Sequence, residues 1–292
     1  MNIELNVAAL EASIRAWLEE DIGMGDVTTM STIAADSLGI GIIHVKDTGL
    51  VAGVPVAEAV FRVVDSSLRF VPKVSDGQAV EYGAVLAEVY GSTRSILLGE
   101  RLALNLMQRM SGIATRTRQF VERLDGLPTR LVDTRKTTPG HRMLEKYAVR
   151  IGGGHNHRFG LYDAVMIKDN HIKGAGGITQ AIQAARGSIP HTMKIEVEVE
   201  SLEQLEEALA ARPDIIMLDN MTPDQMRTAV HRMKSTAPHI MVEASGSVSL
   251  DNIRTIAETG VDVISVGRLT YSVQALDISL DLNEQKAPGT SL

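Results

Sequence analysis

The second half of the chain alternates strand-like and helix-like runs, and this alternation constrains the fold more than any other feature. Strands that alternate with helices form parallel sheets, because each helix returns the chain across the sheet by a right-handed crossover. Six units are too few for an eight-fold barrel, so they predict an incomplete α/β barrel or an open sheet. The expected strands are 129–134, 164–169, 193–199, 215–219, 240–244 and 261–266, and the expected helices are 140–151, 176–186, 202–211, 223–235, 249–259 and 270–281.

The first part of the chain predicts a separate domain of mixed pattern. Expected there are an amphipathic N-terminal helix, strands at 40–45, 68–74 and 85–90, and helices at 56–64 and 95–124, with Gly112 a candidate interruption. We therefore expect an N-terminal domain over 1–115, a barrel domain over 116–282 and a flexible tail at 283–292. A C-terminal helix at 270–282 is a candidate to pack on the first domain.

Composition excludes several classes of protein. The absence of cysteine among the 292 residues excludes disulfide scaffolds and cysteine nucleophiles. A net charge of −7 and an aromatic content of 3% argue against a nucleic-acid partner. No apolar run of 18 residues or signal peptide is found. We expect a cytoplasmic protein with no membrane partner.

Each expected strand of the second half leads into a polar cluster. In parallel α/β folds the carboxyl ends of the strands carry the ligand site, because the loops after the strands converge there. That strands simply end in polar loops explains one or two clusters, but less readily six. The clusters are Asp133–Lys136, Lys168–His171, Glu196 to Glu200, Asp219 with Asn220, Glu243–Gly246 and Gly267 with Arg268.

The strand at 193–199 has one charged face and one apolar face. Lys194, Glu196, Glu198 and Glu200 alternate with apolar residues. When helices cover the apolar face, the charged face must line the inside of a barrel or cleft. Buried carboxylates are costly unless they are paired, metal-bound or solvated. A functional role is therefore favoured over a solvated edge strand.

Four cations follow consecutive segments of this acidic chain and indicate an anionic ligand. They are Arg135, Lys136, Arg158 and Lys168, with His157 and His171 nearby. The guanidinium fork suits carboxylate or phosphate recognition. Glu198 and Asp219 are expected to face the same cleft, where hard oxygen ligands suit Mg²⁺ or ribose hydroxyls.

Glycine-containing turns follow the last two expected strands. Ser245–Ser247 and Val266–Arg268 each precede a helix, where backbone N–H groups can approach a phosphate. The run Gly152–His157 is weak as a metal site and more plausible as a flexible loop that presents His157 and Arg158 to an anion.

Taken together, these segments resemble the quinolinate phosphoribosyltransferase family, over nearly the whole chain and in order. The matching stretches are EDIGMGDVTT (20–29), GERLALNLMQRMSGIAT (99–115), DTRKTTPGHR (133–142), GGGHNHRFGLYDAVMIKDNHI (152–172), EVEVE (196–200), IIMLDNM (215–221) and EASGSVSLDNI (243–253).

The resemblance implies an open N-terminal α/β sandwich and an incomplete, six- to seven-stranded α/β barrel. It implies a head-to-tail homodimer with shared active sites; some family members form hexamers. The implied reaction is decarboxylating phosphoribosyl transfer from phosphoribosyl pyrophosphate to quinolinate with Mg²⁺. Its products are nicotinate mononucleotide, pyrophosphate and CO₂, and it belongs to NAD biosynthesis.

The resemblance also assigns roles to residues. Arg135, Lys136, His157 and Arg158 would hold the quinolinate carboxylates, with Arg101 reaching in from the neighbouring subunit. Thr137 is a further expected substrate-binding residue. Lys136 and Lys168 would act on the pyrophosphate, and Glu198 and Asp219 would hold Mg²⁺ and the ribose. Backbone donors of Ser245, Gly246 and Gly267 would bind the 5-phosphate, in the two turns that also hold Ser247, Val266 and Arg268.

Three alternatives remain open from the sequence. Lys168 at a strand end would also suit a Schiff-base aldolase, although its neighbours Asp169 and His171 oppose a desolvated amine. A phosphoribosyltransferase for nicotinate or another pyridine carboxylate is a second. A non-catalytic phosphate-binding module is the third.

Overall fold

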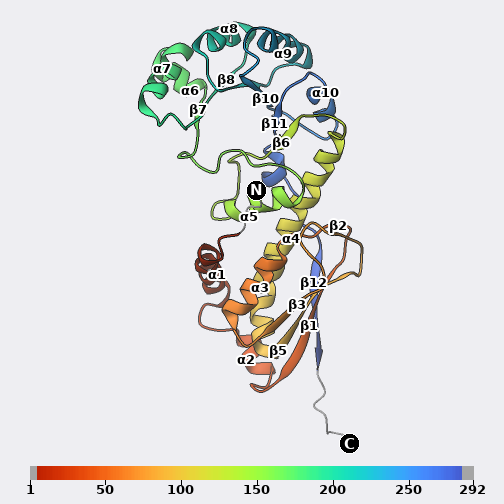
Figure 1. Cartoon of the computed structure of the whole chain (residues 1–292). Helices are drawn as coiled ribbons and strands as arrows, with labels where there is room; N and C mark the ends of the chain where they lie inside the picture. Colours follow the sequence, from red (N-terminus) through yellow and green to blue (C-terminus); the bar gives the residue numbers. More distant parts are fainter. Residues whose placement is uncertain (1–4, 285–292) are drawn as a thin grey trace, which may run out of the picture. The chain divides into compact units, whose positions relative to one another are not determined.

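The computed structural model describes residues 5–284, which form two compact units (Figure 1). The first unit holds the described residues up to Arg116, together with Thr138–Gly152 and the segment from Val273 onward. The second holds Thr117–Thr137 and Gly153–Ser272. Residues 138–152 were expected in the barrel domain, whereas they group with the first unit. Residues 273–282 also group with the first unit, and they belong to the segment that was a candidate to pack there. No helix within 5–284 is both long enough and apolar enough to cross a membrane.

An antiparallel sheet is the centre of the first unit. Its four strands have the order β12-β1-β5-β3, and a two-stranded sheet pairs β2 with β4. Two helices at the start of the chain precede the sheet. The elements are α1 (Val7–Ile22), α2 (Val27–Thr32), β1 (Leu38–Val45), β2 (Gly49–Leu50), α3 (Val54–Val64), β3 (Arg69–Pro72), β4 (Ala79–Val80), β5 (Val85–Ser92), α4 (Thr93–Arg123), α5 (Arg142–Ile151) and β12 (Ile278–Glu284).

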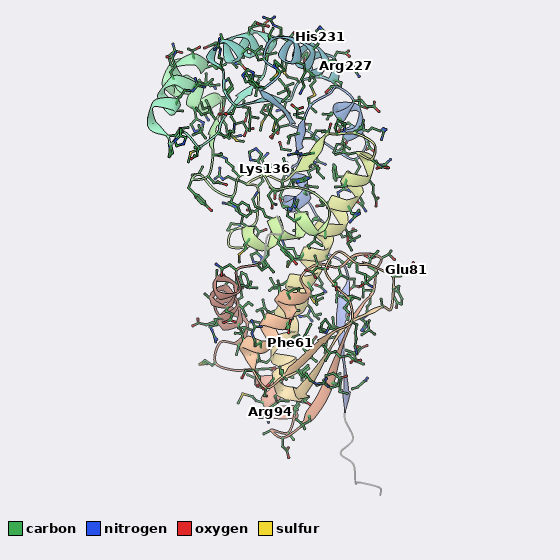
Figure 2. All side chains as sticks on the ribbon, viewed as in Figure 1. Phe61, Glu81, Arg94, Lys136, Arg227 and His231 are labelled. Atoms are coloured by element: carbon green, nitrogen blue, oxygen red, sulfur yellow. The ribbon has the colours of Figure 1, made fainter. Side chains whose placement is uncertain are left out.

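Helices α3 and α4 pack together beside this sheet, as expected for an α/β sandwich. Phe61 of α3 is fully buried and stacks on Phe70 of β3, with 6.0 Å between ring centroids (Figure 2). Gly99 of α4 leaves room for that ring, because a Cβ there would lie 2.9 Å from the Phe61 ring. Close packing of this kind stabilises the layer through dispersion and burial of apolar surface.

The C-terminal helix expected at 270–282 is wrong. Arg268–Tyr271 form the short helix α11, and residues 278–284 form the strand β12, which pairs with β1 in antiparallel register. Ile278, Leu280 and Leu282 alternate with polar residues, which is the period of a strand rather than a helix. The expected tail at 283–292 lies, from residue 285 onward, outside the described residues.

Gly112 does not interrupt α4, which continues unbroken to Arg123. A side chain at Gly112 would collide with the carbonyl group of Gln274. The lack of a side chain at Gly112 therefore allows another backbone segment to approach α4 closely, and it does not break the helix.

Asp76 caps helix α3 from a distant part of the chain. The first residue of the cap, Gly53, has no side chain to offer, and Asp76 accepts hydrogen bonds from the N–H groups of Gly53 and Val54, both at 2.9 Å. The Tyr147 hydroxyl donates to the same carboxylate at 2.8 Å. This carboxylate thus joins α3 to α5 within the first unit.

We expect Asp76→Ala to lower the free energy of unfolding by about 2–4 kcal/mol, because it leaves buried donors unpaired. Burial raises the pKa of Asp76 above its ordinary value, although the hydrogen bonds oppose this. A raised folded pKa contributes stability that is present at low pH and is lost as the pH rises through that pKa. The deficit, measured by urea denaturation, should therefore be larger at low pH than at high pH. Asp36→Ala, at an exposed turn, is the control. It should change neither the free energy of unfolding nor its dependence on pH.

The second unit is an α/β barrel with six parallel strands, which confirms the expected fold class. The strand order β6-β11-β10-β9-β8-β7 follows the chain except that β6 lies beside β11. The sheet thus curls back on itself and remains open between β6 and β7. Its elements are β6 (Arg130–Val132), β7 (Val165–Ile167), α6 (Asp169–Ala175), α7 (Ile178–Ser188), β8 (Ile195–Val199), α8 (Leu202–Ala211), β9 (Ile215–Asp219), α9 (Pro223–Thr236), β10 (Met241–Ser245), α10 (Ile253–Ala257), β11 (Val263–Ser265) and α11 (Arg268–Tyr271).

The glycine-rich segment occupies the open edge of β6. His155 forms an isolated parallel bridge with Val132. Its N–H donates to the Leu131 carbonyl at 2.8 Å, and its carbonyl accepts from the Asp133 N–H at 3.1 Å. This bridge acts as a minimal seventh strand and directs the following residues, His157 and Arg158, toward the carboxyl ends of the sheet.

Candidate active site

A cavity of about 520 Å³ lies at the carboxyl ends of the barrel strands. Its size is within the range of small-molecule sites. Most residues predicted for the site meet there, although they come from six different segments. The lining consists of Thr134, Arg135, Lys136, His157, Arg158, Met166, Lys168, Glu198, Met217, Asp219, Asn220, Ser245, Gly246, Ser247 and Ser265.

The guanidinium groups of Arg135 and Arg158 form one part of the cavity wall. Burial, and then the nearby charge of Arg135, lower the pKa of Arg158. The Nη1 group of Arg158 donates to the Ala164 carbonyl at 3.0 Å, but its buried Nε has no hydrogen-bond partner among the described residues. A bound anion would satisfy that donor and offset the repulsion between the two cations.

Two lysines line the cavity in different settings. The Lys136 backbone is held by the Thr270 hydroxyl, which donates to its carbonyl at 2.8 Å, and its side chain is exposed (Figure 2). The Nζ of Lys168 lies 2.8 Å from Oε2 of Glu198. His171, which we expected near the anion, accepts the Lys168 N–H at 3.0 Å and so caps α6 instead of lining the cavity.

Three carboxylates lie close together at the carboxyl ends of β8 and β9. Ligand oxygens of Glu198, Glu200 and Asp219 lie within 4.8 Å of one another. Burial, and then the charge of Glu198, raise the pKa of Asp219. Crowded carboxylate oxygens of this kind fit a divalent cation, because the cation relieves their repulsion and Mg²⁺ prefers oxygen ligands.

The turn after β10 brings backbone close to the cavity. Gly246 has φ +92° and Ser247 has φ +50°. A Cβ at Gly246 would lie 2.9 Å from the backbone nitrogen of Asn220 and would collide with its side chain. Glycine is therefore required here both by conformation and by space. Successive N–H groups in such a turn can surround a phosphate.

Asp133 holds the loop that delivers His157 and Arg158. The side chain is fully buried. It accepts the His157 N–H at 2.9 Å through Oδ1 and the Asn156 amide at 2.6 Å through Oδ2. The acid at the end of the first barrel strand thus positions a segment more than twenty residues later in the chain.

A buried cluster lies beneath His157. Its Nε2 is 3.2 Å from Oε2 of Glu196 and 3.5 Å from Oε2 of Glu243. Burial lowers the pKa of His157, but the hydrogen bonds to the two carboxylates outweigh burial and raise it to about 10. The charged face of the strand at 193–199 was expected to point inward, and Glu196 and Glu198 do so. Lys194 instead pairs with Asp214, and Glu200 is exposed.

Five predicted site residues do not line the cavity. Gly267 lies close to it, since a Cβ there would lie 3.0 Å from the Lys136 side chain. Arg101 is exposed on α4 in the first unit, where it lies 3.7 Å from Glu100. The five are Arg101, Thr137, Val266, Gly267 and Arg268.

Several site residues were not predicted. A usable signal was the period of two along each strand, because residues two positions before a predicted ligand share its face. Met166, Met217 and Glu243 stand in this relation to Lys168, Asp219 and Ser245. Asp133, Thr134, Glu196 and Asn220 belong to the polar clusters expected at the strand ends but had no individual role assigned, and Ser265 was not predicted.

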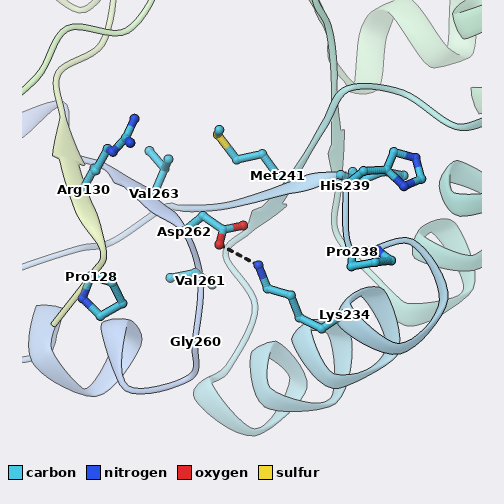
Figure 3. Close-up of a pocket in the computed structure, with 11 residues that line it drawn as sticks. Pro128, Arg130, Lys234, Pro238, His239, Met241, Gly260, Val261, Asp262 and Val263 are labelled. Atoms are coloured by element: carbon cyan, nitrogen blue, oxygen red, sulfur yellow. Dashed lines mark hydrogen bonds and ion pairs between the residues drawn. The ribbon is translucent and has the colours of Figure 1, made fainter.

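A second cavity, of about 350 Å³, lies at the amino ends of β6, β10 and β11 (Figure 3). Its one ion pair among the residues drawn joins Lys234 and Asp262 at 2.6 Å. The Asp262 carboxylate also accepts the Val242 N–H at 2.8 Å. These contacts are structural, and none of the predicted site residues lies there.

Comparison with known proteins agrees with this geometry. Two family models match: the quinolinate phosphoribosyl transferase N-terminal domain over residues 26–111 and the C-terminal domain over residues 113–281. A probable nicotinate-nucleotide pyrophosphorylase [carboxylating] of Synechocystis is 48% identical over 276 residues, covering 92% of this chain and 91% of its own. That of Bacillus subtilis is 46% identical and covers 95% of each chain. The crystal structure of NadC from Streptococcus pyogenes superposes with a TM-score of 0.91 at 39% identity, covering 97% of this chain and 99% of the other.

Proposed function

Since the chain belongs to the quinolinate phosphoribosyl transferase family, we propose that its barrel cavity catalyses decarboxylating phosphoribosyl transfer to quinolinate. The products are nicotinate mononucleotide, pyrophosphate and CO₂, as required for NAD biosynthesis. One observation carries the proposal: guanidinium groups, ammonium groups and a pair of carboxylates all line a single cavity. Binding of a pyridine diacid together with a sugar pyrophosphate needs both the cationic groups and the carboxylates.

Recognition of the two substrates follows from charge. Arg135 and Arg158 bind the quinolinate carboxylates, with His157 in the same wall and Thr137 beside it. Lys136 and Lys168 bind the pyrophosphate, and Glu198 and Asp219 bind the ribose hydroxyls. The 5-phosphate lies against the turns at Ser245–Ser247 and Val266–Arg268. The unsatisfied Nε of Arg158 supports the first of these assignments.

The chemistry is mainly positioning and electrostatic stabilisation. The pyridine nitrogen attacks the anomeric carbon while the bond to pyrophosphate breaks, so positive charge develops on the ribose. Glu198 and Asp219 favour that charge, and Lys136 and Lys168 favour the departing pyrophosphate. Loss of CO₂ then leaves an electron pair on the ring carbon next to the quaternised nitrogen, whose positive charge stabilises it. That carbon takes up a proton in place of the carboxylate.

We propose Mg²⁺ as the cofactor, held by Glu198 and Asp219. Bound there, it would neutralise charge on the pyrophosphate. The support is the donor set, which consists of carboxylate oxygens within 4.8 Å of one another. Chelation with EDTA is expected to abolish turnover, and added Mg²⁺ should restore it, whereas K⁺ should not. Full activity after exhaustive chelation would contradict this assignment.

A Schiff-base role for Lys168 is disfavoured by its geometry. The ammonium is ion-paired with Glu198, and about 44% of its side chain is exposed. A nucleophilic amine requires a desolvated, uncharged form. Borohydride with a carbonyl substrate should therefore leave no adduct on Lys168.

The activity itself is tested with the purified full chain, quinolinate, phosphoribosyl pyrophosphate and Mg²⁺. We expect nicotinate mononucleotide and CO₂ in equal amounts. Nicotinate in place of quinolinate should give no product, which separates this activity from that of a related transferase. Nucleotide binding without turnover would instead indicate a non-catalytic module and would contradict the proposal.

We further propose that the enzyme is a cytoplasmic homodimer whose active sites are shared, with Arg101 of one subunit reaching the other's quinolinate. Its support is that Arg101 is exposed and is not among the residues lining the cavity, and that the apolar side chains of Leu161 and Tyr162 are exposed. Absence of cysteine fits a reducing cytoplasm.

Mixing two inactive variants tests the shared site. Arg101→Ala and Lys136→Ala should each abolish activity, and a mixed dimer contains one intact site. After subunit exchange we expect up to about a quarter of the wild-type rate from a random mixture of subunits. No recovery, with exchange shown by native mass spectrometry, would contradict shared sites.

A further inference from the structure

Asn220 lines the barrel cavity between two groups that the proposed function uses, and the proposed chemistry gives it no role. Its Nδ2 group donates to Oδ2 of Asp219 at 2.7 Å. Its backbone N–H donates to the Ser245 carbonyl at 3.0 Å. One residue therefore contacts both the end of β9, where a carboxylate of the site lies, and the end of β10, where the phosphate turn begins.

Strands β9 and β10 end together at this point. They are parallel neighbours, and Asp219 is the register partner of Ser245. The Asn220 N–H adds one hydrogen bond beyond that pair, after which both segments leave the sheet. Gly246 then lies directly against the Asn220 amide, since a Cβ at Gly246 would collide with Oδ1 of Asn220. The two strand ends are thus fixed to each other by backbone and by side-chain contacts.

The backbone at this junction is unusual. Asn220 has φ +53° and Ser247 has φ +50°, in the left-handed region that residues with a side chain rarely adopt. Among the described residues, the third non-glycine residue with a positive φ is Arg212, at the end of α8. Two of the three therefore line the cavity. Such conformations persist where the surrounding structure fixes them, and they cluster at functional sites.

The Asp219 carboxylate requires a partner that sets its direction. Ligand oxygens of Glu198, Glu200 and Asp219 lie within 4.8 Å of one another, so each carboxylate is repelled by its neighbours. An amide donor fixes the orientation of Asp219 and leaves its negative charge in place, whereas a lysine in the same position would neutralise that charge. Hydrogen bonds from neighbouring groups orient carboxylates at functional sites in this way.

We propose that Asn220 is a positioning residue that holds the Asp219 carboxylate and the phosphate turn at Ser245–Ser247 in one fixed arrangement. The inference rests on the proposed function, in which Asp219 binds the ribose and the turn binds the 5-phosphate. Because the ribose and the 5-phosphate belong to one molecule, fixing the two protein groups to each other lowers the entropy cost of binding it. The Asn220 side chain acts on Asp219, and its left-handed backbone acts on the turn.

Two substitutions separate these contacts. Asn220→Gly keeps the left-handed backbone but removes the amide, whereas Asn220→Ala removes the amide and also disfavours that backbone. We expect Asn220→Gly to raise the Kd for phosphoribosyl pyrophosphate about 10-fold, measured by isothermal titration calorimetry with Mg²⁺ and without quinolinate. Asn220→Ala should raise that Kd further. KM for phosphoribosyl pyrophosphate should rise in parallel, while the Kd for quinolinate stays nearly unchanged.

A double-mutant cycle shows whether the amide acts through Asp219. In an Asp219→Ala background, Asn220→Gly should change the Kd for phosphoribosyl pyrophosphate less than about two-fold, because the carboxylate that the amide orients is already absent. An undiminished effect in that background would mean that the amide contacts the substrate directly, and it would overturn the positioning role. If Asn220→Gly does not fold, Asn220→Asp carries the same test, because an ionised carboxylate of the same shape cannot donate to Asp219.

Arg212→Gly is the matched control. It also places glycine at a left-handed position of the barrel unit, and Arg212 does not line the cavity. Its Kd for phosphoribosyl pyrophosphate should equal that of the wild type. An equal loss in Arg212→Gly, or unchanged binding in Asn220→Gly, would overturn the proposal, and wild-type turnover would then leave the proposed function intact. A wild-type chain without turnover would refute the proposed function, and this inference with it.

Discussion

An Arg158→Gln variant is expected to lose roughly 100-fold or more in kcat/KM for quinolinate, because a carboxylate of the substrate is left without its bidentate partner in a partly buried wall. The Nε of this side chain is buried and has no hydrogen-bond partner among the described residues, so a bound anion would satisfy it. Arg158→Lys keeps the positive charge but loses the two-pronged guanidinium geometry. Its kcat/KM should lie between those of the wild type and Arg158→Gln. Steady-state kinetics with quinolinate as the varied substrate measures the effect.

The matched control for this prediction is Arg227→Gln. Arg227 lies exposed on α9 and pairs only with Asp224 among the contacts found, at 2.6 Å (Figure 2). The Arg227→Gln substitution removes the same charge from the same unit and should leave kcat/KM for quinolinate unchanged. If both variants lose activity equally, the effect comes from net charge. If Arg158→Gln retains wild-type kcat/KM, the assignment of the cavity wall to the diacid fails.

Asp133→Ala should have the second large effect, since it removes the anchor of the loop that carries His157 and Arg158. Two donors, the His157 N–H and the Asn156 amide, would lose a fully buried acceptor. We expect unfolding free energy to fall by about 2–4 kcal/mol. The kcat/KM for quinolinate should also fall, by about 10- to 100-fold, because small displacements of supporting groups disorder a site. Denaturation curves and kinetics on the same preparations measure both quantities.

Asp262→Ala is the matched control at the opposite end of the barrel. That carboxylate also accepts a backbone N–H, from Val242 at 2.8 Å, and it lies in the second cavity (Figure 3). It should lower stability without changing kcat/KM. If Asp262→Ala loses as much activity as Asp133→Ala, the lower kcat/KM of Asp133→Ala comes from general destabilisation of the barrel.

Much of the barrel could be predicted from local patterns. The six expected strands are all present, with each end within two residues of its expected position, because short apolar runs between turn signals are local features. The misassigned segment was 270–282. Its alternation of Ile278, Leu280 and Leu282 favours a strand, but the rhythm of the preceding units suggested a helix. The partner edge on β1 lies more than 230 residues earlier in the chain, so no local pattern shows it.

The site was predicted by chemistry rather than by contacts. The cations Arg135, Lys136, Arg158 and Lys168 all line one cavity, as the placement of charge at strand ends indicates. Asp133 and Glu243 were expected within the polar clusters at the strand ends, but their supporting contacts were not predicted. Their importance depends on which side chains meet across strands, and a single strand's sequence does not contain that information.

The sequence by itself determined the succession of strands and helices and the strand ends at which charge gathers, because both depend on neighbours in the chain. Only the tertiary structure decided how the barrel leaves its open edge between β6 and β7 and fills it with the His155 segment. It also decided that Glu196 and Glu243 meet His157, since β8 and β10 are separated by β9 and share only the barrel interior. Such contacts arise from the closure of the sheet, which brings distant residues together at a cost in chain entropy that no local pattern records.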